Sequence, residues 1–271
     1  EDLDLVFIYT AGISCCLDPT DNLPVFSCYL AYADINNYLQ VTAELILWKK
    51  KMDNTWDPLR PNRDYVKIFH NVQVPLSIVS GDGVNLPYYT SLVIDSNGIP
   101  YIAFQDHHEK KVSVYTRHHN EWAPCGGEYI DTKITDFPSM AIGPDNMPVL
   151  LYVETDDKRL MVKKYNGTTW DDLEYPHTGP VNKIETEHLN EMIADGFASI
   201  TIAGENNPVV ASSEGIMMYN GSTWIPLGYP NHPSQSMGKI SWWVGGNETS
   251  IACTFPNSAK DSIIEVWKLE L

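Results

Sequence analysis

Four kinds of residue recur in the same order along the chain, and this repeat limits the fold more than any other feature of the sequence. A serine comes first, then a proline nine residues later in three of the copies, then an acidic residue and finally a tryptophan. The pattern is clearest in residues 91–122, SLVIDSNGIPYIAFQDHHEKKVSVYTRHHNEW. The serines that begin the copies are 42 to 77 residues apart, and they are Ser14, Ser91, Ser139, Ser199 and Ser241. The chain is therefore built from divergent copies of one unit.

Each copy predicts several antiparallel strands. Apolar residues run from the serine into a turn rich in Gly, Asn and Asp, as in SMAIGPDNMP and SITIAGENNP. The proline opens a second strand, where its missing N–H group is tolerated. A third strand ends in turns such as NGTTW and NGSTW, and Asn-Gly is typical of a tight hairpin. The recurring tryptophans are predicted to begin a short fourth strand, and they are Trp56, Trp122, Trp170 and Trp224.

Four strands in a unit of roughly 40 to 50 residues, with almost no capped amphipathic helix, are typical of a β-propeller blade. We therefore predict an all-β chain that forms a single five-bladed β-propeller domain with four-stranded antiparallel blades. The predicted blades are approximately 10–62, 88–128, 136–175, 196–229 and 238–271. The last copy ends before a fourth strand, so residues 1–9 are expected to supply that strand and to close the last blade. The alternative is an ordinary β-sandwich with accidental internal similarity.

The charge of the chain disfavours several classes of partner. It has 18 Lys and Arg against 35 Asp and Glu, a formal net charge of −17, which argues against nucleic acid and anionic membrane surfaces. No apolar run approaches the ~18 residues of a membrane span. The acidity indicates a soluble surface or, alternatively, one that concentrates cations or basic ligands.

Motifs for cofactors and metals are not found. The five cysteines follow no zinc-binding spacing, and no P-loop, HExxH, GxSxG or dinucleotide fingerprint is present. No cofactor is therefore expected to be required. Sequons at Asn166, Asn220 and Asn247 and a start at Glu1 are compatible with a processed protein that is secreted, periplasmic or on the cell surface. Two of the sequons also match Asn-Gly turn signals, which explain them equally well.

Acidic residues stand at the end of the second strand in four copies. Asp106, Glu154 and Glu214 lie six residues after the aligned proline, and Asp34 takes the corresponding place in the first copy. In radially arranged blades these carboxylates would partly encircle one mouth of the propeller. Such a ring could bind Ca²⁺ or hydrogen-bond sugar hydroxyls. Alternatively, each carboxylate accepts hydrogen bonds from the backbone of its own turn.

Two long connections between copies, 57–90 and 171–198, indicate which face carries function, because variable loops on a rigid scaffold usually do so. Aromatic rings stack on sugars, and imidazoles can bond sugar hydroxyls or a metal. Beside the four carboxylates, the residues predicted to bind ligand are Tyr89, His107, His177 and His188. Alternatively, these side chains lie on the surface or anchor folded loops. No metal ligands are assigned.

The repeats SLVIDSNGIPYIAFQD and SMAIGPDNMPVLLYVETDDKRLMVKKYNGTTW resemble the sialidase-like propeller repeats that are common in secreted bacterial proteins. The resemblance covers nearly the whole chain and implies a β-propeller. Sialidases hold the substrate carboxylate with three arginines and carry S-x-D-x-G-x-T-W boxes. This chain lacks the boxes and has four arginines, Arg60, Arg63, Arg117 and Arg159, so the resemblance does not extend to sialidase activity. Five-bladed relatives by fold include a tachylectin-type lectin and several glycoside hydrolase families.

Three functions are compatible with these patterns. The first is binding of a glycan or another small polar ligand by a lectin-like propeller through its long-loop face. The second is glycoside hydrolysis by two of Asp106, Glu154 and Glu214, which requires carboxyl groups about 5–5.5 Å or ~6.5–9.5 Å apart. The third is a protein-interaction scaffold, whose long loops would present an apolar patch to a partner.

Overall fold

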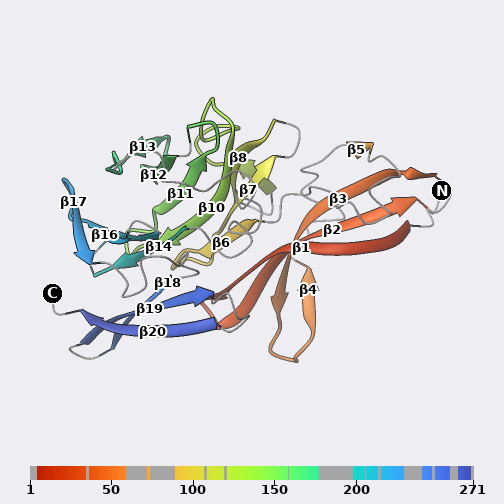
Figure 1. The fold of residues 1–271 in the computed structure, drawn as a ribbon. Helices are drawn as coiled ribbons and strands as arrows, with labels where there is room; N and C mark the ends of the chain where they lie inside the picture. Colours follow the sequence, from red (N-terminus) through yellow and green to blue (C-terminus); the bar gives the residue numbers. More distant parts are fainter. Residues whose placement is uncertain are drawn as a thin grey trace. The chain divides into compact units, whose positions relative to one another are not determined.

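The structure is a computed structural model, and it describes residues 5–34, 37–58, 72–73, 89–106, 109–118, 121–157, 159–176, 198–204, 206–212, 215–228, 240–245, 248–256 and 262–269. These residues form β-strands joined by turns (Figure 1). None of them belongs to a helix with the length and apolar character that crossing a bilayer requires. The chain divides into two compact units, Glu1–Asp136 and Phe137–Leu271.

The first unit contains two antiparallel sheets whose strands follow chain order. The first sheet consists of β1 (Leu5–Asp18), β2 (Leu23–Asp34), β3 (Asn37–Lys50) and β4 (Trp56–Pro58), with β5 (Val72–Gln73) also paired to β3. The second consists of β6 (Thr90–Ile94), β7 (Pro100–Asp106), β8 (Lys111–His118) and β9 (Glu121–Pro124).

Three further antiparallel sheets follow, the first of which begins at the boundary between the units. It consists of β10 (Thr135–Ile142), β11 (Pro148–Glu154), β12 (Arg159–Tyr165) and β13 (Trp170–Asp172). The next consists of β14 (Ala198–Ala203), β15 (Asn207–Ser212), β16 (Gly215–Tyr219) and β17 (Trp224–Gly228). The last contains, among its described residues, β18 (Ile240–Gly245), β19 (Glu248–Pro256) and β20 (Ser262–Leu269).

The predicted all-β fold with four-stranded antiparallel sheets is confirmed. Pro100 and Pro148 open the second strands of their sheets, where no ladder N–H is needed. Trp170 and Trp224 open short fourth strands, as the Asn-Gly turns before them indicate.

The N-terminal segment does not lie where it was predicted to lie. Leu5 to Tyr9 are the beginning of β1, a strand of 14 residues, and pair with β2, so that Leu5 is opposite Asp34 and Tyr9 is opposite Ala31. The expectation that these residues supply the fourth strand of the last sheet is therefore wrong. The physical reason is that β1 does not end before the first repeat: register shifts let it continue past Ala11 to Ser14 and onwards. Residues 1–4 lie outside the described residues.

The recurring serines connect neighbouring sheets. Ser14 Oγ accepts a hydrogen bond from the backbone N–H of Leu92 at 3.0 Å, and Ser139 Oγ accepts one from Ile200 N–H at 3.2 Å. In both cases the donor directly follows the recurring serine of the next copy. A small side chain with an acceptor oxygen lets two first strands approach each other and satisfies a backbone donor between them. This explains why serine, and not a larger apolar residue, marks the start of these copies.

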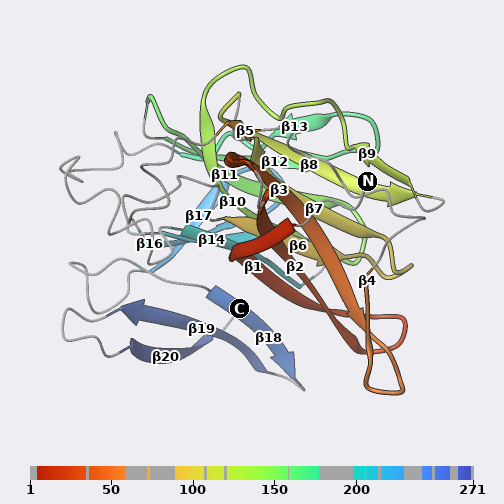
Figure 2. The ribbon, with the colours of Figure 1, turned by 90° about the vertical axis from the view of Figure 1, so that its right-hand side faces the viewer.

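Sheets β10–β13 and β14–β17 share one apolar core. Leu151 and Val162 from the first and Val210 from the second are buried in the same cluster. Tyr175, which follows β13, and Trp224, which begins β17, belong to it as well. The two sheets lie side by side in both views of the ribbon (Figures 1 and 2). Their outer strands therefore enclose the site described next.

Candidate functional site

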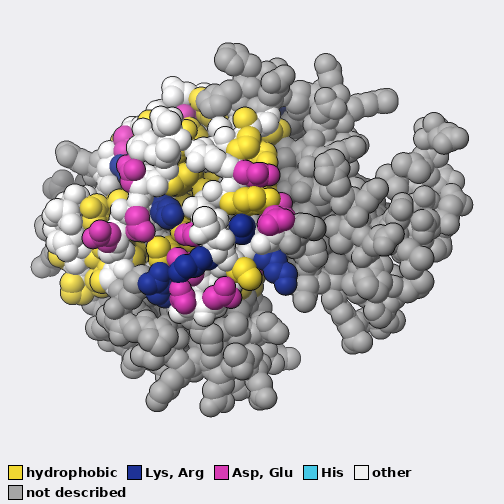
Figure 3. Space-filling view, turned by 90° about the horizontal axis from the view of Figure 1, so that it is seen from above, with side chains coloured by type: hydrophobic (Ala, Val, Ile, Leu, Met, Phe, Trp, Pro, Cys, Tyr) yellow, Lys and Arg dark blue, Asp and Glu magenta, His cyan; other side chains and the backbone are white. Residues whose placement is uncertain are grey.

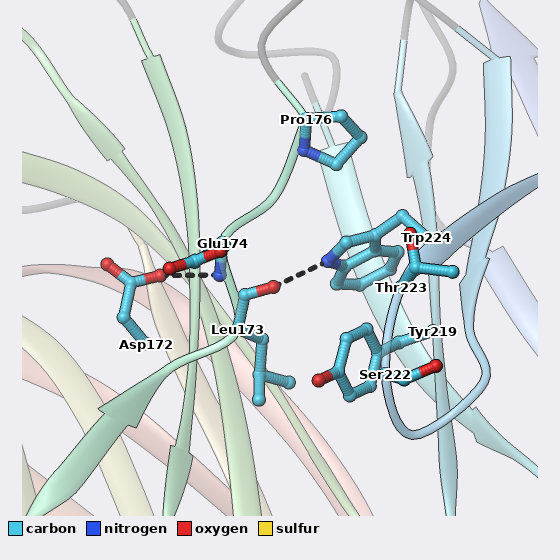
Figure 4. Close-up of a pocket in the computed structure, with 8 residues that line it drawn as sticks. All are labelled: Asp172, Leu173, Glu174, Pro176, Tyr219, Ser222, Thr223 and Trp224. Atoms are coloured by element: carbon cyan, nitrogen blue, oxygen red, sulfur yellow. Dashed lines mark hydrogen bonds between the residues drawn. The ribbon is translucent and has the colours of Figure 1, made fainter.

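A pocket of about 180 Å³ lies between the end of β13 and the β16–β17 hairpin (Figure 4). One wall comes from β13 and the segment after it, and the other comes from the hairpin and the residues beside it. The lining residues are Asp172, Leu173, Glu174, Pro176, Tyr219, Ser222, Thr223 and Trp224.

The hairpin wall owes its shape to the sequence YNGSTW at 219–224. The backbone N–H of Asn220 donates to Thr223 O at 3.0 Å, and the Asn220 side-chain oxygen accepts from Ser222 N–H and Thr223 N–H at 3.1 and 2.9 Å. Gly221 has a φ of 94°, a conformation that favours glycine. The closed turn places Ser222 and Thr223 at the pocket and sets Tyr219 opposite Trp224 across the strands.

The opposite wall is held by hydrogen bonds on both sides of Leu173. Its N–H donates to Val162 O at 2.9 Å, and its carbonyl accepts from the indole Nε1 of Trp224 at 2.8 Å. Asp172 Oδ1 accepts from Glu174 N–H at 2.8 Å, and Figure 4 marks this bond together with the indole bond. Glu174 has a φ of 47°, which is uncommon for a residue other than glycine. The Asp172 carboxylate therefore stabilises an unusual backbone conformation at the pocket.

Packed aromatic rings support the hairpin wall of the pocket. Trp224 is 8% exposed, and its ring centroid lies 4.8 Å from that of Tyr175 at an interplanar angle of 73° and 5.4 Å from that of Tyr219 at 50°. Such edge-to-face and tilted contacts are the favoured arrangements of aromatic pairs. The buried indole N–H donates to Leu173 O, so the aromatic cluster contains a buried donor that has its hydrogen-bond acceptor.

The chemistry of the walls suits a polyhydroxylated ligand. Two exposed carboxylates, of Asp172 and Glu174, stand with the hydroxyl groups of Ser222, Thr223 and Tyr219 around one small space. Apolar edges of leucine, proline and tryptophan complete the lining. Sugars present hydroxyl groups together with an apolar C–H face, and pockets that bind them combine polar groups with aromatic surface.

Glu154, one of the predicted ligand-binding acids, is bound within its own sheet. It ends β11 opposite Arg159 on β12, and its side chain is buried. The guanidinium Nε and Nη2 donate to Glu154 Oε2 at 3.3 and 3.0 Å. This arrangement gives the carboxylate a charged partner across the strands.

Asp106 closes the turn between β7 and β8. Its Oδ1 accepts a hydrogen bond from Glu109 N–H at 2.9 Å, which is the local alternative considered for these acids. Burial, together with the charges of Asp106, Glu128 and Glu109, raises the pKa of Tyr129 to about 12. The ammonium of Lys111 lies 5.3 Å from the Tyr129 ring centroid.

The remaining predicted ligand-binding residues are only partly described. Asp34 ends β2, and Tyr89 directly precedes β6 and is half-buried. The others lie outside the described residues, and they are His107, His177, His188 and Glu214. The carboxylate ring, its use as a catalytic pair and the Ca²⁺ site stay predictions. In the part of the chain that the structure describes, no three His, Cys, Asp or Glu side chains gather as a metal site would require.

The acidic pocket residues were missed in the sequence, although a signal for them exists. The segment WDDLEYP at 170–176 aligns with WIPLGYP at 224–230, so the Trp, Leu, Tyr and Pro are shared. Leu173 and Tyr175 are shared by the two copies and serve the fold. Asp172 and Glu174 are not shared, because the next copy has a proline and a glycine at the aligned positions. The acids are thus peculiar to one copy, which a search for recurring residues passes over.

Acidic side chains do not gather into one patch on the face shown in Figure 3. Among the described side chains of that face, Asp and Glu are interspersed with Lys and Arg and with apolar groups. On this face, therefore, the described acidic residues that contribute to the net charge of −17 do not form a single patch.

The sequence matches no protein-family model and no curated protein. Its fold, however, is similar to solved structures. A Penicillium chrysogenum α-L-arabinanase complexed with arabinobiose matches 95% of the chain over 76% of its own length, with a TM-score of 0.53 and 10% identity. A Hadza microbial sialidase matches 96% of the chain over 52% of its length, with a TM-score of 0.54 and 11% identity. The fold is of the β-propeller type.

A third similar structure is Trypanosoma rangeli sialidase in complex with the inhibitor DANA. It matches 95% of the chain over 44% of its own length, with a TM-score of 0.51 and 12% identity. The chain thus spans about half the length of the two sialidases. The resemblance of the repeats to sialidase-like propellers is supported at the level of this fold, and identities of 10–12% carry nothing finer.

Proposed function

We propose that this chain binds a carbohydrate in the pocket between β13 and the β16–β17 hairpin, as a lectin-like β-propeller in which each of the five sheets is one blade. The observation that carries the proposal is the pocket itself, where carboxylates and hydroxyl groups surround a small space against fixed aromatic rings. Its first wall lies at the start of connection 171–198, one of the two long connections that were expected to carry function.

The size and rigidity of the pocket support a small ligand. A volume of about 180 Å³ is below that of pockets for drug-sized molecules, which take ~300–1,000 Å³, so one or two sugar residues are the appropriate size. The hydrogen bonds of Leu173 and the turn at Asn220 hold both walls before any ligand arrives. A preformed site loses little conformational freedom on binding. The arabinanase of similar fold was solved with arabinobiose, an analogy of fold that agrees with a saccharide ligand.

Tyr219→Ala tests this proposal, with Tyr165→Ala as its matched control. Both tyrosines stand at the same place in YNG-S/T-TW hairpins and face a tryptophan across the strands, but only Tyr219 lines the pocket. A glycan array first identifies a ligand of the unmodified protein, and calorimetric titration then measures affinities. Removing an aromatic side chain at the centre of a site weakens binding by about 2 kcal/mol, roughly thirtyfold. We expect this loss for Tyr219→Ala and unchanged affinity for Tyr165→Ala.

Two results would overturn the proposal. One is the absence of any glycan ligand on the array, and the other is an equal loss of affinity in the two variants, since that would place the site elsewhere. Chromatography of the bound glycan after incubation also separates binding from hydrolysis, because a glycoside hydrolase would release shorter products.

A further inference from the structure

We infer that the pocket prefers sugars with a free, protonated amino group over neutral and acidic sugars. This inference rests on the proposed function and names the ligand class of the same site. Among the described residues that line the pocket, Asp172 and Glu174 carry charge, and neither a lysine nor an arginine is present. A ligand that brings positive charge therefore complements the pocket, and a ligand with a carboxylate meets two like charges.

The backbone conformation at Glu174 links the two acids. Glu174 adopts a left-handed backbone conformation in which glycine is less strained, and the aligned residue of the next copy is Gly228. Asp172 stabilises this conformation through its bond to Glu174 N–H.

Lys163 is opposite Asp172 across the strands, and its ammonium lies over the ring of Tyr152, 5.9 Å from the centroid. Asp171, which precedes the pocket residues, accepts a hydrogen bond from Asn166 Nδ2 at 3.0 Å in its own hairpin. The chain as a whole carries −17 and attracts cationic ligands at long range.

The geometry also suits an ammonium group on a sugar ring. An ammonium donates up to three hydrogen bonds, and carboxylates are its strongest acceptors. The sugar hydroxyl groups next to it would meet the hydroxyl groups of Ser222 and Thr223, and its C–H face would lie against Tyr219.

The test compares three disaccharides by calorimetry at a pH of about 6, where aliphatic amines are protonated. They are the glucosamine dimer, its N-acetylated form and a dimer containing glucuronic acid. Because both carboxylates are exposed, each contributes modestly, and we expect the amino form to bind about three- to tenfold more tightly than the acetylated form. The acidic dimer should bind most weakly.

Asp172→Asn and Glu174→Gln remove the charges and keep the shapes, and the asparagine retains an oxygen for Glu174 N–H. Each should reduce the preference for the amino form, and the double variant should abolish it. Asp171→Asn is the matched control, because it removes an exposed carboxylate from the same strand without touching the pocket lining. Thermal unfolding of all variants shows whether they are folded.

The outcomes separate the two proposals. If the protein binds acetylated and amino forms equally, or if Asp171→Asn lowers the preference as much as the pocket variants do, the inference is wrong while carbohydrate binding stands. If none of the disaccharides and no array glycan binds, both proposals fail. A preference for the amino form that is lost only in the pocket variants supports the inference.

Discussion

Residues 165–170 and 219–224 have nearly the same sequence, YNGTTW and YNGSTW, but of the two hairpins the second lines the pocket between β13 and β17. Their turns are closed in the same way: Asn166 N–H donates to Thr169 O, and Asn220 N–H donates to Thr223 O, both at 3.0 Å. The aromatic pairs are also alike, with Tyr and Trp centroids 5.3 Å apart in the first hairpin and 5.4 Å in the second. The local structure is therefore a property of the six residues.

The surroundings of the two tryptophans differ. Trp170 is half-buried, whereas Trp224 is 8% exposed, donates to Leu173 O and packs on Tyr175. Leu173 and Tyr175 both follow β13, the strand that the first hairpin leads into. The contacts that bury Trp224 therefore come from the neighbouring sheet and not from its own. The second hairpin lines the pocket because the end of β13, the fourth strand of the neighbouring sheet, covers it.

Replacing the tryptophans by alanine should show the largest difference between the hairpins. Trp224→Ala removes a buried ring and leaves a cavity, which lowers the free energy of unfolding by about 3–5 kcal/mol. Trp170→Ala should lower it by about 1–2 kcal/mol, because its ring is half exposed already. Urea denaturation followed by fluorescence and circular dichroism measures both. Equal losses would mean that the burial of Trp224 does not distinguish the hairpins.

The turn glycines should show no difference. Gly167 and Gly221 have φ values of 97° and 94°, and a Cβ added at either would meet nothing within 4 Å. Alanine at each position therefore costs only the strain of the left-handed backbone, about 1–2 kcal/mol. Denaturation of the two variants side by side checks this. A clear inequality would show that the turns are not locally equivalent.

The smallest expected effect is that of the indole N–H. Trp224→Phe keeps an aromatic ring but removes the donor to Leu173 O, so the free energy of unfolding should fall by about 1 kcal/mol. Trp170→Phe should have a smaller effect, since the Trp170 side chain is less buried than that of Trp224. The affinity for a glycan should fall in Trp224→Phe as well, because Leu173 positions the first wall. Unchanged stability and unchanged binding would show that the indole hydrogen bond supports neither the fold nor the pocket.

Several features of the fold follow from individual residues and were predicted. Pro148 stands at the first residue of a strand, where its missing N–H is tolerated, and Asn220 with Gly221 closes a hairpin because both suit its backbone. The closing strand was predicted wrongly, because a bulge that carries β1 through Ala11 has no sequence signature as clear as a turn. Ser14 was recognised as recurring, but its bond to Leu92 N–H depends on a neighbouring sheet.

The sequence by itself determined the strands, the hairpins and the pairing of Tyr219 with Trp224, since these depend on hydrogen bonds and side-chain alternation over a few residues. Only the tertiary structure decided which hairpin is covered and where the pocket lies. The bond between Trp224 and Leu173 spans 51 residues of chain. Contacts over such distances form through the packing of two apolar sheet faces, and neither hairpin's own sequence specifies which sheet will lie beside it.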